Sequence, residues 1–194
     1  MRKLTYFVAC SIDGFIGDPD GDATSMMTFL SEEFLGFLTS EYPETVAVQG
    51  RKVLGIEGAE NRHFDTVIQG RASYQLALDT GITSPYGHME ELVASRTLRV
   101  APDPGVEIVS EDVVGRIREL KAQESRRGIW LCGGSELAGE LIDEIDELVI
   151  KTYPQIYGSG MPMFGTGFTV TPFALRDVRT FGNGILVRTY DRVR

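Results

Sequence analysis

Three short turns in the sequence combine small or hydroxylated residues with groups that suit the binding of an anion. Gly133–Ser135 follows an apolar run, and positions without side chains let a ligand approach the backbone. Gly70–Ser73 offers the guanidinium of Arg71 and the hydroxyl of Ser73, and the pair Ser95–Arg96 repeats these two groups. A helix that starts at such a turn directs its positive end toward a phosphate. Together the turns predict a track for an anionic ligand.

Each turn also has a simpler interpretation. A Gly-Gly pair can make a tight turn without binding anything, and a charged side chain at the end of a strand is usually solvated. Neither the GxGxxG pattern of a Rossmann domain nor the lysine of a P-loop occurs at these turns. The hypothesis of an anion site therefore requires that the three turns meet at one edge of one sheet.

Apolar runs before the turns predict the strands that position them. Strands are expected at 4–10, 65–69, 92–94, 129–132 and 148–150, with helices around 34–40, 73–78 and 111–124 and after Ser135. The last two strands, 174–181 and 185–193, flank Gly182–Gly184 and predict a C-terminal antiparallel hairpin. Strands that alternate with helices predict an α/β fold with a mostly parallel mixed sheet and helices on both faces. Ligands bind beyond the carboxyl ends of such strands, so the turns at Ser11, Gly70, Ser95 and Gly133 are expected to share one site.

Composition limits the class of protein and its partners. The 194 residues, 42% hydrophobic, are enough for one core, so residues 1–194 are interpreted as a single domain. A net charge of -9 opposes attraction to nucleic acid or an anionic membrane, so an anionic ligand needs a local basic cluster. Cys10 and Cys132 lie in apolar runs that suit reduced core residues and a cytoplasmic protein. No signal peptide or membrane-spanning stretch is apparent.

The order of the motifs along the chain resembles the dihydrofolate reductase superfamily. The resemblance rests on Ala9 in the first strand, on Ser11–Gly17, Gly70–Tyr74, Ser95–Leu98 and Gly133–Leu137, and it spans nearly the whole chain. A later stretch, Pro154–Phe164, is similar to one branch of that superfamily. This branch is typified by the C-terminal reductase domain of the bifunctional deaminase/reductase of riboflavin biosynthesis.

The resemblance implies a three-layer fold, an NADPH cofactor and a homodimer, since members of the branch are commonly dimeric. It places Ala9 and Ile16 against the nicotinamide, and Ser95 and Arg96 toward the adenosine ribose. The residues that it assigns to the phosphates and the pyrophosphate are Gly70, Arg71, Ser73, Gly133, Gly134, Ser135, Glu136 and Leu137.

The sequence departs from dihydrofolate reductases where those enzymes bind the pterin. Their acidic residue on the first helix has Glu32 or Glu33 as its nearest counterpart, and Met26–Thr28 replaces their tryptophan. These departures argue against folate as the substrate. The insertion 41–64 is longer than the fold requires at this place and is expected to shape a different substrate pocket.

The expected chemistry is reduction of a small heterocyclic substrate, pyrimidine- or pterin-like, or of another conjugated C=N or C=O compound. Asp13, on the loop that leaves the first strand, is a candidate for substrate contact or proton relay, although Asp-Gly also favours a plain turn. His63 and His88 show no metal-ligand spacing, so no metal is expected. Two alternatives stay open: a nucleotide-binding sensor without chemistry, and a structural interaction module.

Overall fold

An eight-stranded sheet runs through the computed structural model, which describes residues 1–193. Its strands are β1 (Leu4–Cys10), β3 (Phe64–Gly70), β4 (Glu90–Ala94), β5 (Val106–Val109), β6 (Gly128–Gly133), β7 (Glu147–Thr152), β9 (Phe173–Thr180) and β10 (Leu186–Arg192). They lie in the order β5-β4-β3-β6-β1-β7-β10-β9. The first six are parallel, and β10 and β9 form the antiparallel hairpin at one edge.

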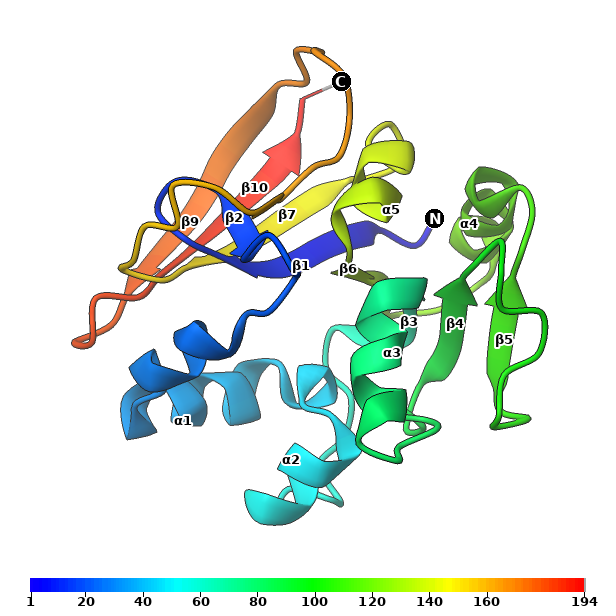
Figure 1. Cartoon of the computed structure of the whole chain (residues 1–194), viewed down its shortest axis with the longest axis horizontal. Helices are drawn as coiled ribbons and strands as arrows, with labels where there is room; N and C mark the ends of the chain where they lie inside the picture. The colour runs from blue at the N-terminus through cyan, green and yellow to red at the C-terminus, as the bar shows by residue number, and fades with distance from the viewer. Residues whose placement is uncertain (194) are drawn as a thin grey trace.

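Helices cover both faces of this sheet, as Figure 1 shows. They are α1 (Glu32–Glu41), α2 (Val48–Val53), α3 (Arg71–Asp79), α4 (Val113–Ala122) and α5 (Ser135–Glu140), with 3-10 turns at Thr24–Phe29 and Pro43–Thr45. Apolar residues of α4 and α5 share one buried cluster with side chains of β1 and β6. Phe34 of α1 belongs to a second cluster with Phe7 and Trp130, on the opposite face of the sheet. The predicted three-layer α/β fold is confirmed.

Local signals in the sequence account for several element boundaries. The Ser31 side chain accepts a hydrogen bond from the backbone N–H of Phe34 (3.2 Å) and caps the start of α1. The predicted hairpin is present, but its loop, Phe181 to Ile185, is longer than a two-residue turn. The backbone N–H of Phe181 donates a hydrogen bond to the carbonyl of Ile185 (3.0 Å) and closes this loop. Gly184 takes a positive φ of 87° in this loop, a conformation that glycine adopts without strain.

Three strands and one helix were absent from the sequence prediction. The strand β5 is short, and a two-stranded ribbon joins β2 (Phe15–Gly17) to β8 (Met161–Pro162). The helix is α2, inside the insertion 41–64. The buried guanidinium of Arg51 donates to the carbonyl of Pro43 (2.8 Å), and the buried Glu44 carboxylate accepts from the amide of Phe64 (2.9 Å). These contacts fold the insertion onto itself and join it to the start of β3.

Within residues 1–193, no helix is both long enough and apolar enough to cross a membrane.

Candidate active site

The turns after β3 and β6 lie side by side. Gln69 and Gly133 are register partners, and a Cβ atom at Gly70 would lie 3.5 Å from the carbonyl oxygen of Gly133. A Cβ atom at Gly134 would lie 3.9 Å from the Ser73 hydroxyl oxygen. The Gly133–Gly134 peptide bond is cis. The two glycine turns therefore lie in contact with each other, and side chains added at Gly70 or Gly134 would meet the neighbouring turn.

The four predicted turns follow neighbouring parallel strands in the order β4, β3, β6 and β1. Ala94, just before Ser95, is the register partner of Gly70, which places the turn after β4 next to the turn after β3. Because the carboxyl ends of parallel strands meet at one edge, these turns form a continuous line from Arg96 to Ala9. The prediction that they meet at one edge of the sheet is confirmed.

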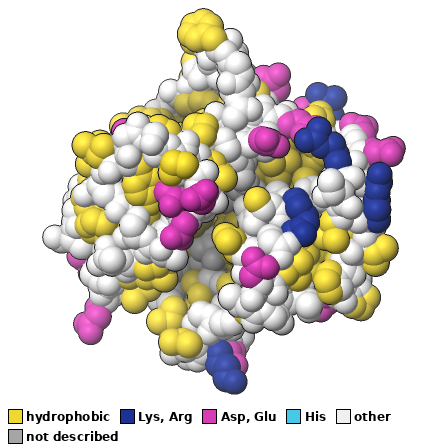
Figure 2. Space-filling view, viewed as in Figure 1, with side chains coloured by type: hydrophobic (Ala, Val, Ile, Leu, Met, Phe, Trp, Pro, Cys, Tyr) yellow, Lys and Arg dark blue, Asp and Glu magenta, His cyan; other side chains and the backbone are white. Residues whose placement is uncertain are grey.

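Two arginines on this edge have no carboxylate partner. Arg96 is exposed and Arg71 is half-buried, and within residues 1–193 neither forms an ion pair. In contrast, Arg116 on α4 pairs with Glu107 at 2.8 Å and with Glu90 at 3.5 Å. Figure 2 shows that the basic side chains visible on this face lie mainly over the half that carries α3, β4 and β5. Although the chain is acidic overall, Arg71 and Arg96 give this edge of the sheet positive charge that no carboxylate within residues 1–193 neutralises.

The hydroxyl of Ser95 has a structural role in its turn. Its oxygen accepts hydrogen bonds from the backbone N–H groups of Leu98 (2.8 Å) and Thr97 (3.3 Å). These contacts fix the backbone from which the Arg96 side chain leaves. The Ser95 hydroxyl therefore positions Arg96, whether or not it also contacts a ligand.

The start of α5 contains a buried hydroxyl without a partner. The Ser135 side chain is buried, and its oxygen has no hydrogen-bond partner within residues 1–193. Leu137 belongs to the hydrophobic core, whereas Glu136 is exposed, so only their backbone amides are suited to an anion. A buried hydroxyl needs an acceptor, and a phosphate oxygen would supply one. Glycine backbone, hydroxyls and unpaired arginines are the donor set that a dinucleotide requires.

Ala9 and Ile16, the residues expected at the nicotinamide, lie on either side of the exit from β1. Both are half-buried. Ala9 packs against the cluster that contains Phe7, on the α1 side, whereas Ile16 packs against the cluster under α4 and α5. The two side chains therefore border the end of β1 from opposite faces of the sheet.

Asp13 connects two loops above the end of β1. Its exposed carboxylate accepts hydrogen bonds from the Ser11 hydroxyl (2.6 Å) and from the amides of Gly158 (2.7 Å) and Tyr157 (3.2 Å). The Ser11 hydrogen bond, assisted by those two amides, holds the pKa of the Asp13 carboxyl below its usual range. A carboxylate held in its charged form anchors the 155–158 segment better than it donates a proton.

The stretch Pro154–Phe164 packs against the loop that follows β1. The amide of Ile12 donates to the carbonyl of Gln155 (2.8 Å), and the amide of Met163 donates to the carbonyl of Gly14 (3.0 Å). The short β2–β8 ribbon continues this contact. The stretch that supported the family resemblance thus holds the loop of Asp13 and Ile16 in place.

The acidic residues of the first helix contact solvent or the hairpin loop. Glu32 is exposed, and the Glu33 carboxylate accepts a hydrogen bond from the amide of Gly182 (3.0 Å) in the hairpin loop. Met26 is buried in the cluster with Phe34. Glu33 therefore stabilises the hairpin loop, which lies at the edge of the sheet where β7 ends.

Sequence reasoning missed three residues on the α1 side of the same edge. The Lys151 ammonium lies over the Phe7 ring, 4.0 Å from its centroid, and Cys132 and Tyr86 contact each other at 3.9 Å between sulfur and oxygen. The available signal was a charged residue inside the apolar run of β7. Among residues 1–193, no group of three or more histidine, cysteine or acidic side chains is arranged to hold a metal ion.

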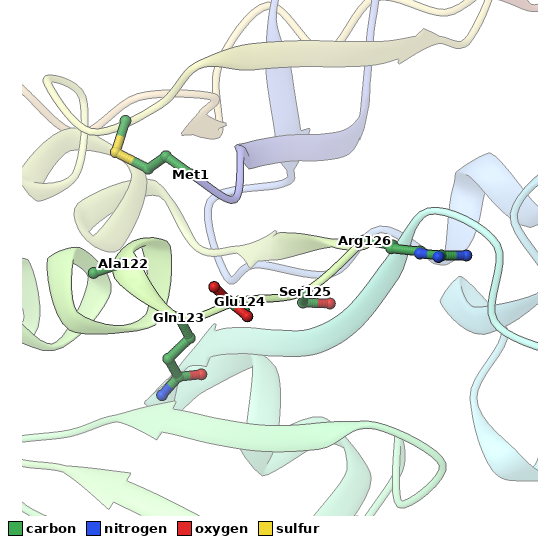
Figure 3. A pocket seen from close by; sticks show the side chains of 6 residues that line it. All are labelled: Met1, Ala122, Gln123, Glu124, Ser125 and Arg126. Carbon is green, nitrogen blue, oxygen red and sulfur yellow. The ribbon is translucent and has the colours of Figure 1, made fainter.

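A hollow lies at the opposite end of the sheet from the glycine turns. Figure 3 shows its lining, which comes from the start of the chain, the end of α4 and the connection between α4 and β6. Its side chains are Met1, Ala122, Gln123, Glu124, Ser125 and Arg126. It is remote from the glycine turns and holds no set of groups suited to catalysis.

Comparison with known families decides the relationship that these features suggest. The model of the RibD C-terminal domain matches residues 2–187. The chain belongs to the RibD C-terminal domain family. The chain is also 28% identical over 186 residues to the uncharacterized protein YwjB of Bacillus subtilis strain 168, an alignment that covers 95% of both proteins. The resemblance inferred from the short motifs is confirmed.

Solved structures agree on the dihydrofolate reductase-like fold. A protein of Shewanella sp. PV-4, provisionally assigned to riboflavin biosynthesis, matches over the full length of both chains, with a TM-score of 0.70 and 23% identity. The deaminase/reductase of Thermotoga maritima has a TM-score of 0.63 and 16% identity, and the match covers 99% of this chain and 57% of that one. Dihydrofolate reductase of Enterococcus faecalis, complexed with NADP(H), has a TM-score of 0.61 and 15% identity, and the match covers 99% of this chain and 97% of that one. Family and fold together support a reductase-like role.

Proposed function

We propose that this chain is an NADPH-dependent reductase of a small heterocyclic, pyrimidine- or pterin-like, or other conjugated C=N or C=O substrate. The observation that carries the proposal is the continuous line of turns along one sheet edge, from Arg96 through Gly70 and Gly134 to Ala9. Its order matches the order of parts in an extended dinucleotide. Membership of the RibD C-terminal domain family, and a fold shared with a reductase complexed with NADP(H), support the same cofactor.

In this proposal each turn has a separate task. Arg96 binds the phosphate on the adenosine ribose, while Arg71 and Ser73 bind the bridging phosphates together with the backbone at Gly70. Gly133 and Gly134 leave room for the pyrophosphate, and Ser135, Glu136 and Leu137 contribute a hydroxyl and amides. Ala9 and Ile16 border the nicotinamide. When bound, the reduced nicotinamide supplies the hydride.

The protein's own contribution to the reaction is mainly placement. Asp13, held by Ser11 and the 157–158 amides, keeps the loop above β1 in one position and contacts the substrate from there. Its lowered pKa makes it a weak source of protons, so water is the better candidate for the proton that follows hydride transfer. Fixed positions of donor and acceptor account for much of the rate enhancement in such reactions.

The cofactor proposal is tested by thermal unfolding with NADPH, NADH, flavin mononucleotide and methotrexate. A ligand present at a hundred times its Kd stabilises the native state by about 2.7 kcal/mol, which raises the Tm of a domain this size by roughly 5–10 °C. We expect the largest shift from NADPH. If no dinucleotide shifts the Tm, the chain is an interaction module; if NADPH binds but no candidate substrate oxidises it, the chain is a non-catalytic nucleotide-binding protein.

We also expect a homodimer that uses the β9 edge of the sheet. Seven of the eight residues of β9 are exposed, including Leu175 and Val178, and Phe168 nearby is 98% exposed. An uncovered strand edge with apolar side chains favours pairing with a second copy. Sedimentation at micromolar concentration should give a dimer, and Leu175→Lys combined with Val178→Lys should give a monomer. Val53→Lys, at an 84% exposed valine of α2, is the control; a wild-type monomer would refute the expectation.

A further inference from the structure

Lys151 places a positive charge inside an otherwise apolar part of the candidate site. It lies near the carboxyl end of β7, where the preceding residues Leu148, Val149 and Ile150 are all buried. Its register partners are Ala9 on β1 and Val187 on β10. Its ammonium group lies 4.0 Å from the centroid of the Phe7 ring, so the side chain lies on the α1 side of the sheet.

The surroundings of Lys151 contain no negative charge that compensates it. No carboxylate within residues 1–193 lies within 4.0 Å of the ammonium, and it donates no hydrogen bond to any of them. The titratable groups that act on it are the thiols of Cys132 and Cys10. Burial raises the pKa of the Cys132 thiol to about 11 and raises that of Cys10 as well, so both stay neutral at physiological pH. Tyr86, which contacts Cys132, is also kept neutral by burial, which raises its pKa.

A half-buried ammonium without a counter-ion is unfavourable unless a ligand supplies the negative charge. Burial lowers the pKa of Lys151 to about 8, so the amine still carries its proton at neutral pH. The contact with the Phe7 ring compensates the charge only in part. The neighbouring position, Ala9, is the one that we assign to the nicotinamide, so an anion bound at Lys151 would lie beside the reacting end of the cofactor.

From these observations we infer that Lys151 determines substrate specificity by pairing with a carboxylate or phosphate oxyanion on the substrate, held at the end of β7. The inference rests on the proposed function and adds the charge of the substrate to it. It assigns Lys151 a binding role, in which the ammonium orients the substrate against the nicotinamide. Val187 and Ala9, on either side of it, offer no competing acceptor in their side chains.

The test compares ligands that differ by one oxyanion. The two pairs are orotate with uracil, and uridine 5′-monophosphate with uridine. Each ligand is titrated into wild type, and binding is followed by the fluorescence of Trp130, the single tryptophan of the chain. Trp130 suits this readout because its ring lies 6.2 Å from that of Phe7. We expect the anionic member of at least one pair to bind about tenfold more tightly or better. The pair that responds distinguishes a carboxylate from a phosphate.

Variants assign any preference to Lys151. Lys151→Met keeps a long apolar side chain over Phe7 and should abolish the preference, while Lys151→Arg should retain it. Lys52→Met, at an exposed lysine of α2, removes the same charge elsewhere and should leave the preference unchanged. NADPH affinity, measured on the same samples, should not respond to Lys151→Met. Failure of NADPH to bind wild type would reject the proposed function separately.

Wild type alone provides a check that does not depend on the folding of a variant. The pKa of Lys151 is about 8 before a ligand binds, and a bound anion favours the charged amine and raises this pKa. The preference for the anionic ligand should therefore be complete near pH 6 and fall as the pH rises above 8. Equal binding of both members of each pair, including no binding of either, overturns the inference. The inference is also overturned by a preference that survives in Lys151→Met, or by one that does not change between pH 6 and pH 9, where uracil and uridine are still largely neutral.

Discussion

Gly134→Val is expected to weaken NADPH binding by a hundredfold or more while leaving the fold intact. Gly134 has a φ of −83° and a ψ of 179°, which valine adopts without strain. The nearest atom to an added Cβ is the Ser73 hydroxyl oxygen at 3.9 Å, an ordinary contact distance. The valine side chain therefore fits the protein but occupies the position beside the Ser73 hydroxyl that we assign to the pyrophosphate. A hundredfold loss corresponds to about 2.7 kcal/mol of binding free energy.

Two further variants separate loss of binding from loss of folding. Gly58→Val adds the same side chain at a glycine with no atom within 4 Å of the added Cβ, away from the glycine turns, and should bind NADPH like wild type. Gly133→Val should lower the Tm, because Gly133 has a φ of 141°, a conformation that valine does not adopt without strain. Isothermal titration and thermal unfolding give both quantities for each variant. Normal NADPH affinity of a folded Gly134→Val protein would show that the turn is only structural.

Arg96→Ala is expected to weaken NADPH binding by roughly ten- to a hundredfold, with little effect on NADH. A charge-assisted hydrogen bond to a phosphate contributes on the order of 1.5 to 3 kcal/mol, and only NADPH carries the 2′-phosphate. Arg96 is exposed and unpaired within the described residues, and no acidic residue lies between Leu92 and Arg99 to bond a ribose diol instead. Wild type should therefore prefer NADPH over NADH.

Titration of wild type and variant with both cofactors measures this selectivity directly. Arg96→Lys should retain part of the preference, since it keeps the charge but loses the planar pair of donors. Arg99→Ala removes an exposed arginine three residues away and serves as the matched control. An equal loss of NADPH and NADH affinity in Arg96→Ala would mean that this side chain does not read the 2′-phosphate. Arg71 would then be the next residue to test.

The sequence was sufficient to predict the elements that carry strong local signals. Buried parallel strands such as β1 and β6 are apolar almost throughout, and the glycines and serines that follow them mark the turns. The strand β5 was not predicted because its four residues, Val106–Val109, include the exposed Glu107 and are too few to form a clear apolar pattern. The helix α2 lacks an apolar stripe and is held by the contacts of Arg51 with backbone carbonyls instead.

The candidate site could be predicted only where its residues adjoin a turn. Arg71, Ser73 and Gly134 follow strands directly, so knowing that the strands are parallel was enough to bring them together. Lys151 was missed because its position beside Ala9 and over Phe7 follows from the register of β1 against β7. Likewise, two of the hydrogen bonds that hold Asp13 come from amides 144 and 145 residues away along the chain. No local pattern encodes such pairings.

The position of β6 in the sheet has a consequence for how the protein matures. Because β6 lies between β3 and β1, these two strands share no hydrogen bonds, and the first half of the chain can form only separate pieces of the sheet. β1 cannot pair with β6 until Ile129, the register partner of Leu4, has been synthesised. Closing so long a loop is entropically costly and slows folding. During synthesis on the ribosome, the edge that carries the glycine turns should therefore form late and in a single step, when Gly128–Gly133 inserts and joins the two halves.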